Sequence, residues 1–118
     1  MTVAPEDLPD LARRARTLLS ERRADAPLVT YRALAEALGV APPGTIQKVA
    51  AVLEHLMRED AAGSRPMIAA LVTSRAGDIP RRGFFDLAVA LGRFPPDADS
   101  HRAAWEAEVA AVLGQSDG

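Results

Sequence analysis

Hydrophobic residues recur at intervals of three and four along most of the chain, which is the spacing of an amphipathic helix. The first stripe predicts a helix over residues 7–23 and contains Leu8, Leu11, Ala12, Ala15, Leu18 and Leu19. A shorter stripe predicts a second helix over Tyr31–Leu38. Thr30 can cap its first turn through the side-chain hydroxyl, and Gly39 is the expected left-handed stop.

A third helix is predicted from Thr45, as a second N-cap, to about Asp60. Its stripe consists of Ile46, Val49, Val52, Leu53, Leu56 and Met57. The segment between the second and third helices contains Pro42 and Pro43, which cannot continue a helix. Two short capped helices joined by a tight turn are typical of a helix-turn-helix.

The next segment changes character, because residues 67–74 are apolar, partly β-branched and flanked by Pro66 and Gly77. This pattern predicts a strand. Residues 75–78 suit a turn, and residues 79–82 can return as a second strand, restricted to a sheet edge because Pro80 lacks an N–H group. The sequence therefore predicts one β-hairpin, followed by a short helix over residues 84–91 that Gly92 ends.

A last helix is predicted over residues 101–113, capped by Asp99 or Ser100 and ended by Gly114. Its apolar stripe contains Trp105, Val109, Val112 and Leu113. Together these elements predict a helix-rich α+β fold, a winged helix-turn-helix-like domain with one β-hairpin and flanking N- and C-terminal helices. We expect one domain over residues 1–118, with the N-terminal helix at 7–23, the winged-helix-like core at 30–94 and the C-terminal helix at 100–113.

Composition narrows the class of protein. The 118 residues contain no cysteine, and no apolar run reaches the roughly 18 residues that a membrane span needs. Acids and prolines occupy the N-terminus, where a signal peptide would be basic and then apolar. We therefore expect a cytoplasmic protein with no membrane partner. The net charge of −2 counts against a non-specific nucleic-acid coat, although residues 30–95 carry a small excess of basic residues.

Catalytic patterns are missing from the sequence. The serines lack a nearby histidine or lysine base, no glycine-rich phosphate loop is present, and the acids show no acid–base spacing. His55 and Glu59 lie four residues apart, so they could either share a metal or lie on a solvated helix face. We expect no enzyme, no cofactor, including any small-molecule cofactor, and no metal site, unless the fold itself assembles a site that spacing does not reveal.

Polar and basic residues suggest a nucleic-acid surface instead. The candidate contacts are Tyr31, Arg32, Thr45, Gln47, Lys48, Arg75, Arg81 and Arg82. A phenol at the start of a helix can donate to a phosphate, and residues in the first turn of a recognition helix read bases. The arginines would form a basic wing. The alternatives are a tyrosine packed at the domain edge, an exposed polar helix face and a solubilising loop.

The aromatic residues allow two interpretations each. Phe84 and Phe85 follow Gly83 and could stack on a base or pin the hairpin to the core. Trp105 lies on the apolar stripe of the last helix, so it belongs either to the core or to a dimer surface.

From Val29 onward the chain resembles the C-terminal winged-helix domain of alkylguanine-DNA alkyltransferases and alkyltransferase-like proteins. The likeness rests on Thr30-Tyr31-Arg32-Ala33-Leu34-Ala35 with Leu38-Gly39, the third helix, Arg65-Pro66, Gly77 and Gly83-Phe84-Phe85. It implies that Tyr31 contacts the phosphate of a target nucleotide and that Gln47 or Lys48 takes the place of the family's arginine finger.

The family's Pro-Cys-His-Arg motif is absent, and Leu71-Val72-Thr73-Ser74-Arg75 stands in its place. Because the chain has no cysteine to accept an alkyl group, the resemblance implies a winged-helix scaffold that contacts DNA but does not transfer alkyl groups. The strand predicted after Arg65-Pro66, followed by the run from Gly77 to Phe84 with Ile79-Pro80 inside it, also resembles small uncharacterised bacterial domains. That resemblance implies no function. We therefore expect a non-catalytic protein that binds duplex DNA. The alternative is a protein-protein interaction module or adaptor, with a protein partner or a homodimer, which the acidic pI of about 5.6 favours.

Overall fold

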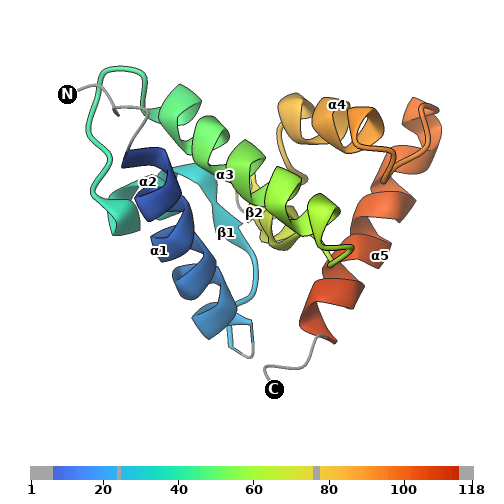
Figure 1. The fold of residues 1–118 in the computed structure, drawn as a ribbon, viewed down its shortest axis with the longest axis horizontal. Helices are drawn as coiled ribbons and strands as arrows, with labels where there is room; N and C mark the ends of the chain where they lie inside the picture. Colours follow the sequence, from blue (N-terminus) through green and yellow to red (C-terminus); the bar gives the residue numbers. More distant parts are fainter. Residues whose placement is uncertain (1–6, 24, 76–77, 115–118) are drawn as a thin grey trace.

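The computed structural model describes residues 7–23, 25–75 and 78–114 and contains five α-helices and a small sheet within them (Figure 1). In chain order the elements are α1 (Leu8–Arg22), β1 (Val29–Thr30), α2 (Tyr31–Leu38), α3 (Thr45–Ala62), the 3-10 helix η2 (Ile68–Leu71), β2 (Val72–Thr73), α4 (Arg82–Ala90), the 3-10 helix η3 (Ala98–Ser100) and α5 (His101–Leu113). The helix-rich α+β prediction is confirmed.

The apolar stripes and capping residues of the sequence predicted the positions of the five helices well. The helices α2 and α5 have the predicted bounds, and α1, α3 and α4 differ from them by one or two residues. The Thr30 side chain accepts a hydrogen bond of 3.0 Å from the Ala33 N–H, and Gly39 has the left-handed φ of 73°. Both observations confirm the predicted limits of α2, because each signal acts within one helical turn.

Two predicted caps are wrong. Gly44, with φ 72°, precedes α3 and Thr45 is already helical, without a side-chain capping bond. Glycine adopts this left-handed conformation without steric cost, so it leads the chain directly into the helix. Before α5, Ser100 likewise makes no capping bond, while the Asp97 carboxylate accepts from the Asp99 N–H at the start of η3.

The described residues show no β-hairpin, although one was predicted. The strand β2 pairs with β1 in parallel, with Val29 opposite Val72 and Thr30 opposite Thr73. Residues 76–77 of the predicted turn lie outside the described residues. Two backbone hydrogen bonds join the residues on either side of them, from the Asp78 N–H to the Arg75 carbonyl at 3.0 Å and from the Ser74 N–H to the Ile79 carbonyl at 2.9 Å. Arg82 already belongs to α4. The predicted return strand includes Pro80, which has no N–H to extend a ladder.

Half of the predicted strand at residues 67–74 forms the 3-10 helix η2, and only Val72 and Thr73 belong to a strand. Every residue from Met67 to Thr73 is at most 3% exposed. Helices α1, α3 and α5 all contact η2, so this segment is buried on every side. A short apolar run of this kind has no polar face, and periodicity cannot distinguish a strand from a buried turn.

One hydrophobic cluster draws residues from all five α-helices, including Leu19, Leu34, Leu56, Phe84 and Trp105. Figure 1 shows α1 beside α3, with α4 and α5 on the other side of α3. Within the described ranges, the structure has no helix that combines the length and the apolar character of a membrane span.

The buried carboxylate of Asp60 connects α1, α3 and η2 through hydrogen bonds. The Asp60 side chain is fully buried near the end of α3. It accepts hydrogen bonds from Arg16 on α1 at 2.8 Å, from Arg65 at 3.2 Å and from the Ile68 N–H of η2 at 3.0 Å. A buried charge is tolerated when it is paired and hydrogen-bonded in this way.

Candidate functional site

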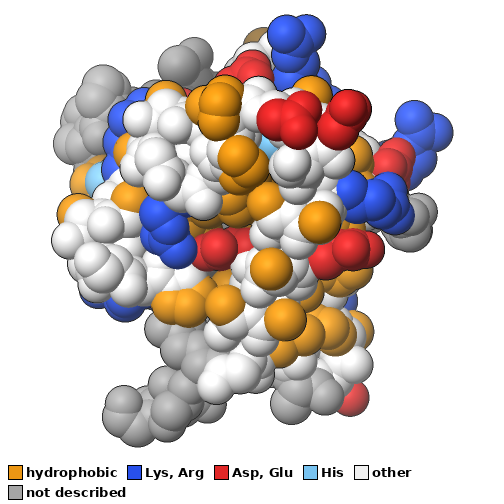
Figure 2. Space-filling model, turned by 90° about the vertical axis from the view of Figure 1, so that its right-hand side faces the viewer, with side chains coloured by type: hydrophobic (Ala, Val, Ile, Leu, Met, Phe, Trp, Pro, Cys, Tyr) orange, Lys and Arg blue, Asp and Glu red, His pale blue; other side chains and the backbone are white. Residues whose placement is uncertain are grey.

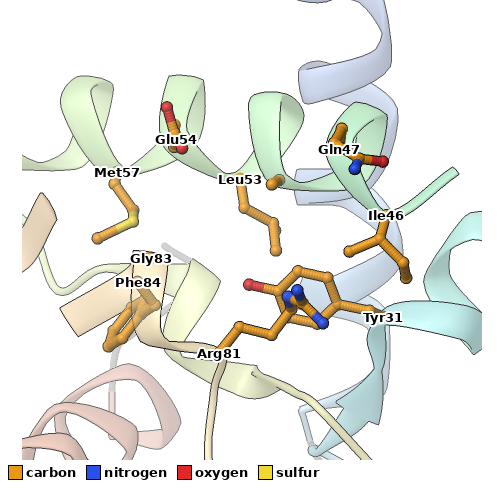
Figure 3. A pocket seen from close by; sticks show the side chains of 10 residues that line it. Tyr31, Ile46, Gln47, Leu53, Glu54, Met57, Arg81, Gly83 and Phe84 are labelled. Carbon is orange, nitrogen blue, oxygen red and sulfur yellow. The ribbon is translucent and has the colours of Figure 1, made fainter. Parts of the chain in front are cut away.

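A cavity of about 220 Å³ opens between α3, the start of α2 and the segment that leads into α4 (Figure 3). Its lining combines apolar and polar side chains and consists of Tyr31, Ile46, Gln47, Ala50, Leu53, Glu54, Met57, Arg81, Gly83 and Phe84. Largely apolar cavities with a few convergent polar groups are the usual form of a binding site. We therefore take this cavity as the candidate site.

The parallel sheet explains how distant segments meet at this cavity. Strands β1 and β2 run in the same direction, so both end at one edge of the sheet, after Thr30 and Thr73. Tyr31 follows directly at this edge. The hydrogen bond from Ser74 to Ile79 turns the chain back, and Arg81 then lies against Tyr31. The cavity is therefore a product of the sheet topology.

Tyr31 forms one wall of the cavity and is 4% exposed. The guanidinium carbon of Arg81 lies 5.7 Å from the centroid of its ring, which is a cation–π distance. In Figure 3 the phenol hydroxyl points into the cavity. Within the described residues the hydroxyl makes no protein hydrogen bond, so it can donate to a bound group.

Burial raises the pKa of Tyr31 from 10.0 to about 12; the charge of Arg81 lowers it, and that of Glu54 raises it. The folded protein therefore holds the phenol proton more tightly than the unfolded chain does. The stability that follows from this difference is fully present below pH 10 and is lost as the pH rises from 10 to 12. The Tyr31 phenol is consequently neutral near pH 7.

The phenolate absorbance should report this shift directly, because Tyr31 is the only tyrosine. We expect a midpoint near pH 12 in the folded protein and near 10 in denaturant. The folded protein should lose at most about 3 kcal/mol of unfolding free energy over this interval. The Tyr31→Phe variant serves as the control and should not show this loss. A midpoint near 10 under native conditions would contradict the buried position of the ring.

Gln47 and Glu54 line the opposite side of the cavity, on α3 (Figure 3). They lie seven residues apart, which is two helical turns, so both side chains project from the same face. Gln47 was among the residues predicted from the sequence, whereas Glu54 was not. The signal that was available is this seven-residue spacing. Leu53, Met57 and Phe84 give the cavity its apolar surface.

Three predicted arginines lie outside the cavity and pair with acids on their own segments. The N···O distances are 3.6 Å for Arg32–Glu36, 3.3 Å for Arg75–Asp78 and 3.7 Å for Arg82–Asp86. The side chains of these three arginines are 83–92% exposed. Exposed pairs of this kind contribute only about 0.2–1 kcal/mol each, so these arginines can exchange partners.

The remaining predicted contacts lie at the start of α3. Thr45 is the first helical residue, and the Lys48 ammonium donates a 3.0 Å hydrogen bond to the Ala41 carbonyl of the preceding loop. Of the eight predicted contact residues, the cavity therefore brings together three, namely Tyr31, Gln47 and Arg81.

The histidine and the aromatic residues considered as candidate contacts do not form a further site within the described residues. His55 lies 3.4 Å from Glu59, and the described part of the chain contains no group of three or more side chains that could hold a metal. Phe84 and Phe85 are buried and meet edge to face at 5.4 Å between centroids. Trp105 is buried as well. All three aromatic residues thus belong to the core.

Comparison of the chain with protein-family models, with curated proteins and with solved structures found no match. The resemblance to alkyltransferases therefore stays a prediction, and the geometry of the site carries the functional argument.

Proposed function

We propose that this protein is a non-catalytic DNA-binding module in which α2 and α3 act as a helix-turn-helix. The first turn of α3 would enter the major groove, where Gln47 can bond an adenine edge. The observation that carries the proposal is the position of Arg81. Its guanidinium lies over Tyr31 at the cavity that Gln47 also lines. Within the described residues Arg81 has no carboxylate partner, so it is available to a phosphate.

The exposed arginines support the same surface. Arg32 follows Tyr31, and Arg82 follows Arg81, so both lie next to residues that line the cavity. Their exposed ion pairs with acids are weak, so a phosphate can replace the carboxylate. A bidentate guanidinium–phosphate contact is stronger than such an exposed pair. Without a hairpin, these arginines would act from the turn before α4 and from the helix ends.

The α5 side of the molecule carries side chains of mixed charge. Figure 2 shows basic, acidic and hydrophobic side chains interspersed on that face. Mixed charges of this kind create little net field toward a polyanion. We propose the side with α2, the start of α3 and Arg81 as the DNA surface, because Arg81 there has no carboxylate partner within the described residues.

Titration of fluorescent duplex DNA at two salt concentrations tests the proposal. We expect salt-sensitive binding, and replacing both Arg81 and Arg82 by Ala should weaken it about tenfold on every DNA sequence. The slope of log K against log salt should fall by roughly 0.9 for each phosphate that the variant no longer neutralises. Arg102→Ala is the matched control, because Arg102 on α5 pairs with Glu106 at 3.8 Å as Arg82 does with Asp86.

An affinity that is unchanged in the double variant would contradict the assigned surface. If the protein does not bind DNA at low salt, the proposal fails, and the protein-protein interaction module becomes the better hypothesis. The observation that favours that alternative is the exposure of apolar side chains on the outer face of α5. Leu113 is 42% exposed there, and Ala103, Ala107 and Ala110 are exposed beside it. Light scattering of the purified protein would detect a homodimer.

A further inference from the structure

The cavity carries opposite charges that do not neutralise each other. Glu54 lines it from α3, and Arg81 lines it from the segment before α4 (Figure 3). Among residues 7–23, 25–75 and 78–114, neither side chain has an ion-pair partner within 4.0 Å, although most of the other arginines in these ranges do. A cation and an anion thus face one apolar cavity without forming a bond to each other.

We propose that this cavity binds a free α-amino acid with an apolar side chain. The ligand carboxylate would accept hydrogen bonds from the Arg81 guanidinium and the Tyr31 hydroxyl. The ligand ammonium would donate to the Glu54 carboxylate, and the ligand side chain would pack on Leu53, Met57 and Phe84. This inference does not depend on DNA binding, because Glu54 has no part in the proposed DNA surface.

The charges of the cavity select this class of ligand. A simple carboxylate would satisfy Arg81 and face the like charge of Glu54, whereas a simple amine would satisfy Glu54 and face Arg81. A zwitterion matches both groups at once. Tyr31 keeps its proton near neutral pH, so its hydroxyl remains a donor for the ligand carboxylate.

The size and surface of the cavity agree with a ligand of this kind. At about 220 Å³ the cavity is smaller than the 300 Å³ or more of typical drug-binding pockets, so it suits a small metabolite. The thioether of Met57 is flexible and can adapt to side chains of different shape. We therefore expect preference for apolar side chains in general, with glycine binding worst.

Isothermal titration calorimetry of the full chain tests the ligand class. The probes are L-leucine, L-methionine and L-phenylalanine, with N-acetyl-L-phenylalanine, phenethylamine and glycine as controls. At least one of the three amino acids should bind. Removing the ammonium or the carboxylate from phenylalanine should weaken binding about tenfold, since a charge-assisted hydrogen bond is lost in each case. Absence of binding for all three amino acids, or equal binding of the N-acetylated compound, would overturn the proposal.

Variants then test the assigned partners. Glu54→Gln and Arg81→Ala should each weaken the amino acid about tenfold, while Arg81→Lys, which keeps the charge, should lose less. Glu106→Gln and Arg102→Ala on α5 are the matched controls and should bind as the parent protein does. If Glu54→Gln retains full affinity, the ammonium site is wrong. Glu54→Gln should also bind DNA normally, so failure of the amino-acid site is distinguishable from failure of the DNA proposal.

Discussion

Replacing Asp60 by Ala should lower the free energy of unfolding by about 3–5 kcal/mol, because the change breaks a buried charge network. Asp60 is fully buried and receives hydrogen bonds from Arg16, Arg65 and the Ile68 N–H. Removing the carboxylate leaves the Ile68 N–H buried without its acceptor and leaves Arg16 with only the exposed Glu59. The three elements α1, α3 and η2 would no longer share a polar anchor.

Urea denaturation followed by circular dichroism measures this loss. Glu59→Gln is the matched control, since Glu59 also pairs with Arg16, at 3.1 Å, but its side chain is 48% exposed. That neighbouring substitution should cost less than about 1 kcal/mol. A cost for Asp60→Ala similar to that of Glu59→Gln would show that water replaces the lost carboxylate and that the network does not hold the elements together.

Replacing Trp105 by Ala should destabilise the protein by about 3–5 kcal/mol, the cost of removing a large buried aromatic side chain. Trp105 is 7% exposed, and its indole N–H donates a 2.8 Å hydrogen bond to the Ala70 carbonyl of η2. This residue therefore connects α5 to the buried segment at the centre of the molecule. The substitution should weaken the packing of α5 on η2, the element that α5 covers.

A second substitution separates the two contributions of Trp105. Trp105→Phe keeps an aromatic ring and removes the indole donor, so we expect a smaller loss of about 1–3 kcal/mol. Arg102→Ala, three residues earlier on the same helix and exposed, should change stability by about 0.5 kcal/mol or less. Thermal unfolding of the three variants gives the comparison. A loss under about 1 kcal/mol for Trp105→Ala would place Trp105 outside the cooperative core.

The helices of this protein follow from signals that act within one turn of the chain. The Thr30 hydroxyl bonds the N–H of Ala33, and Gly39 adopts a left-handed conformation that ends α2. The apolar stripe of α3 faces the core as its spacing predicts, with Val49, Val52 and Leu56 fully buried. Because these contacts depend on near neighbours, sequence reasoning located the helices correctly.

The sheet was mispredicted because its partners are distant in sequence. The predicted hairpin assumed that residues 67–74 pair with the next extended segment. The actual partner is β1, which lies two helices earlier in the chain. Because β1 is only two residues long, it is too short to show the alternating pattern of a strand. Nothing within the apolar run itself indicates which other segment will lie beside it, so only the packed structure decides the pairing.

Sequence by itself therefore determined the helices of this protein and its lack of cysteine chemistry, and it named Tyr31, Gln47 and Arg81 as candidate nucleic-acid contacts without indicating that they meet at one cavity. The tertiary structure alone decided that Tyr31, Glu54 and Arg81 share one cavity and that Asp60 joins Arg16 across two helices. The physical reason is the range of the interactions. Helix signals act over three or four residues, whereas the parallel sheet and the buried ion pairs join segments that only burial of the common core brings together.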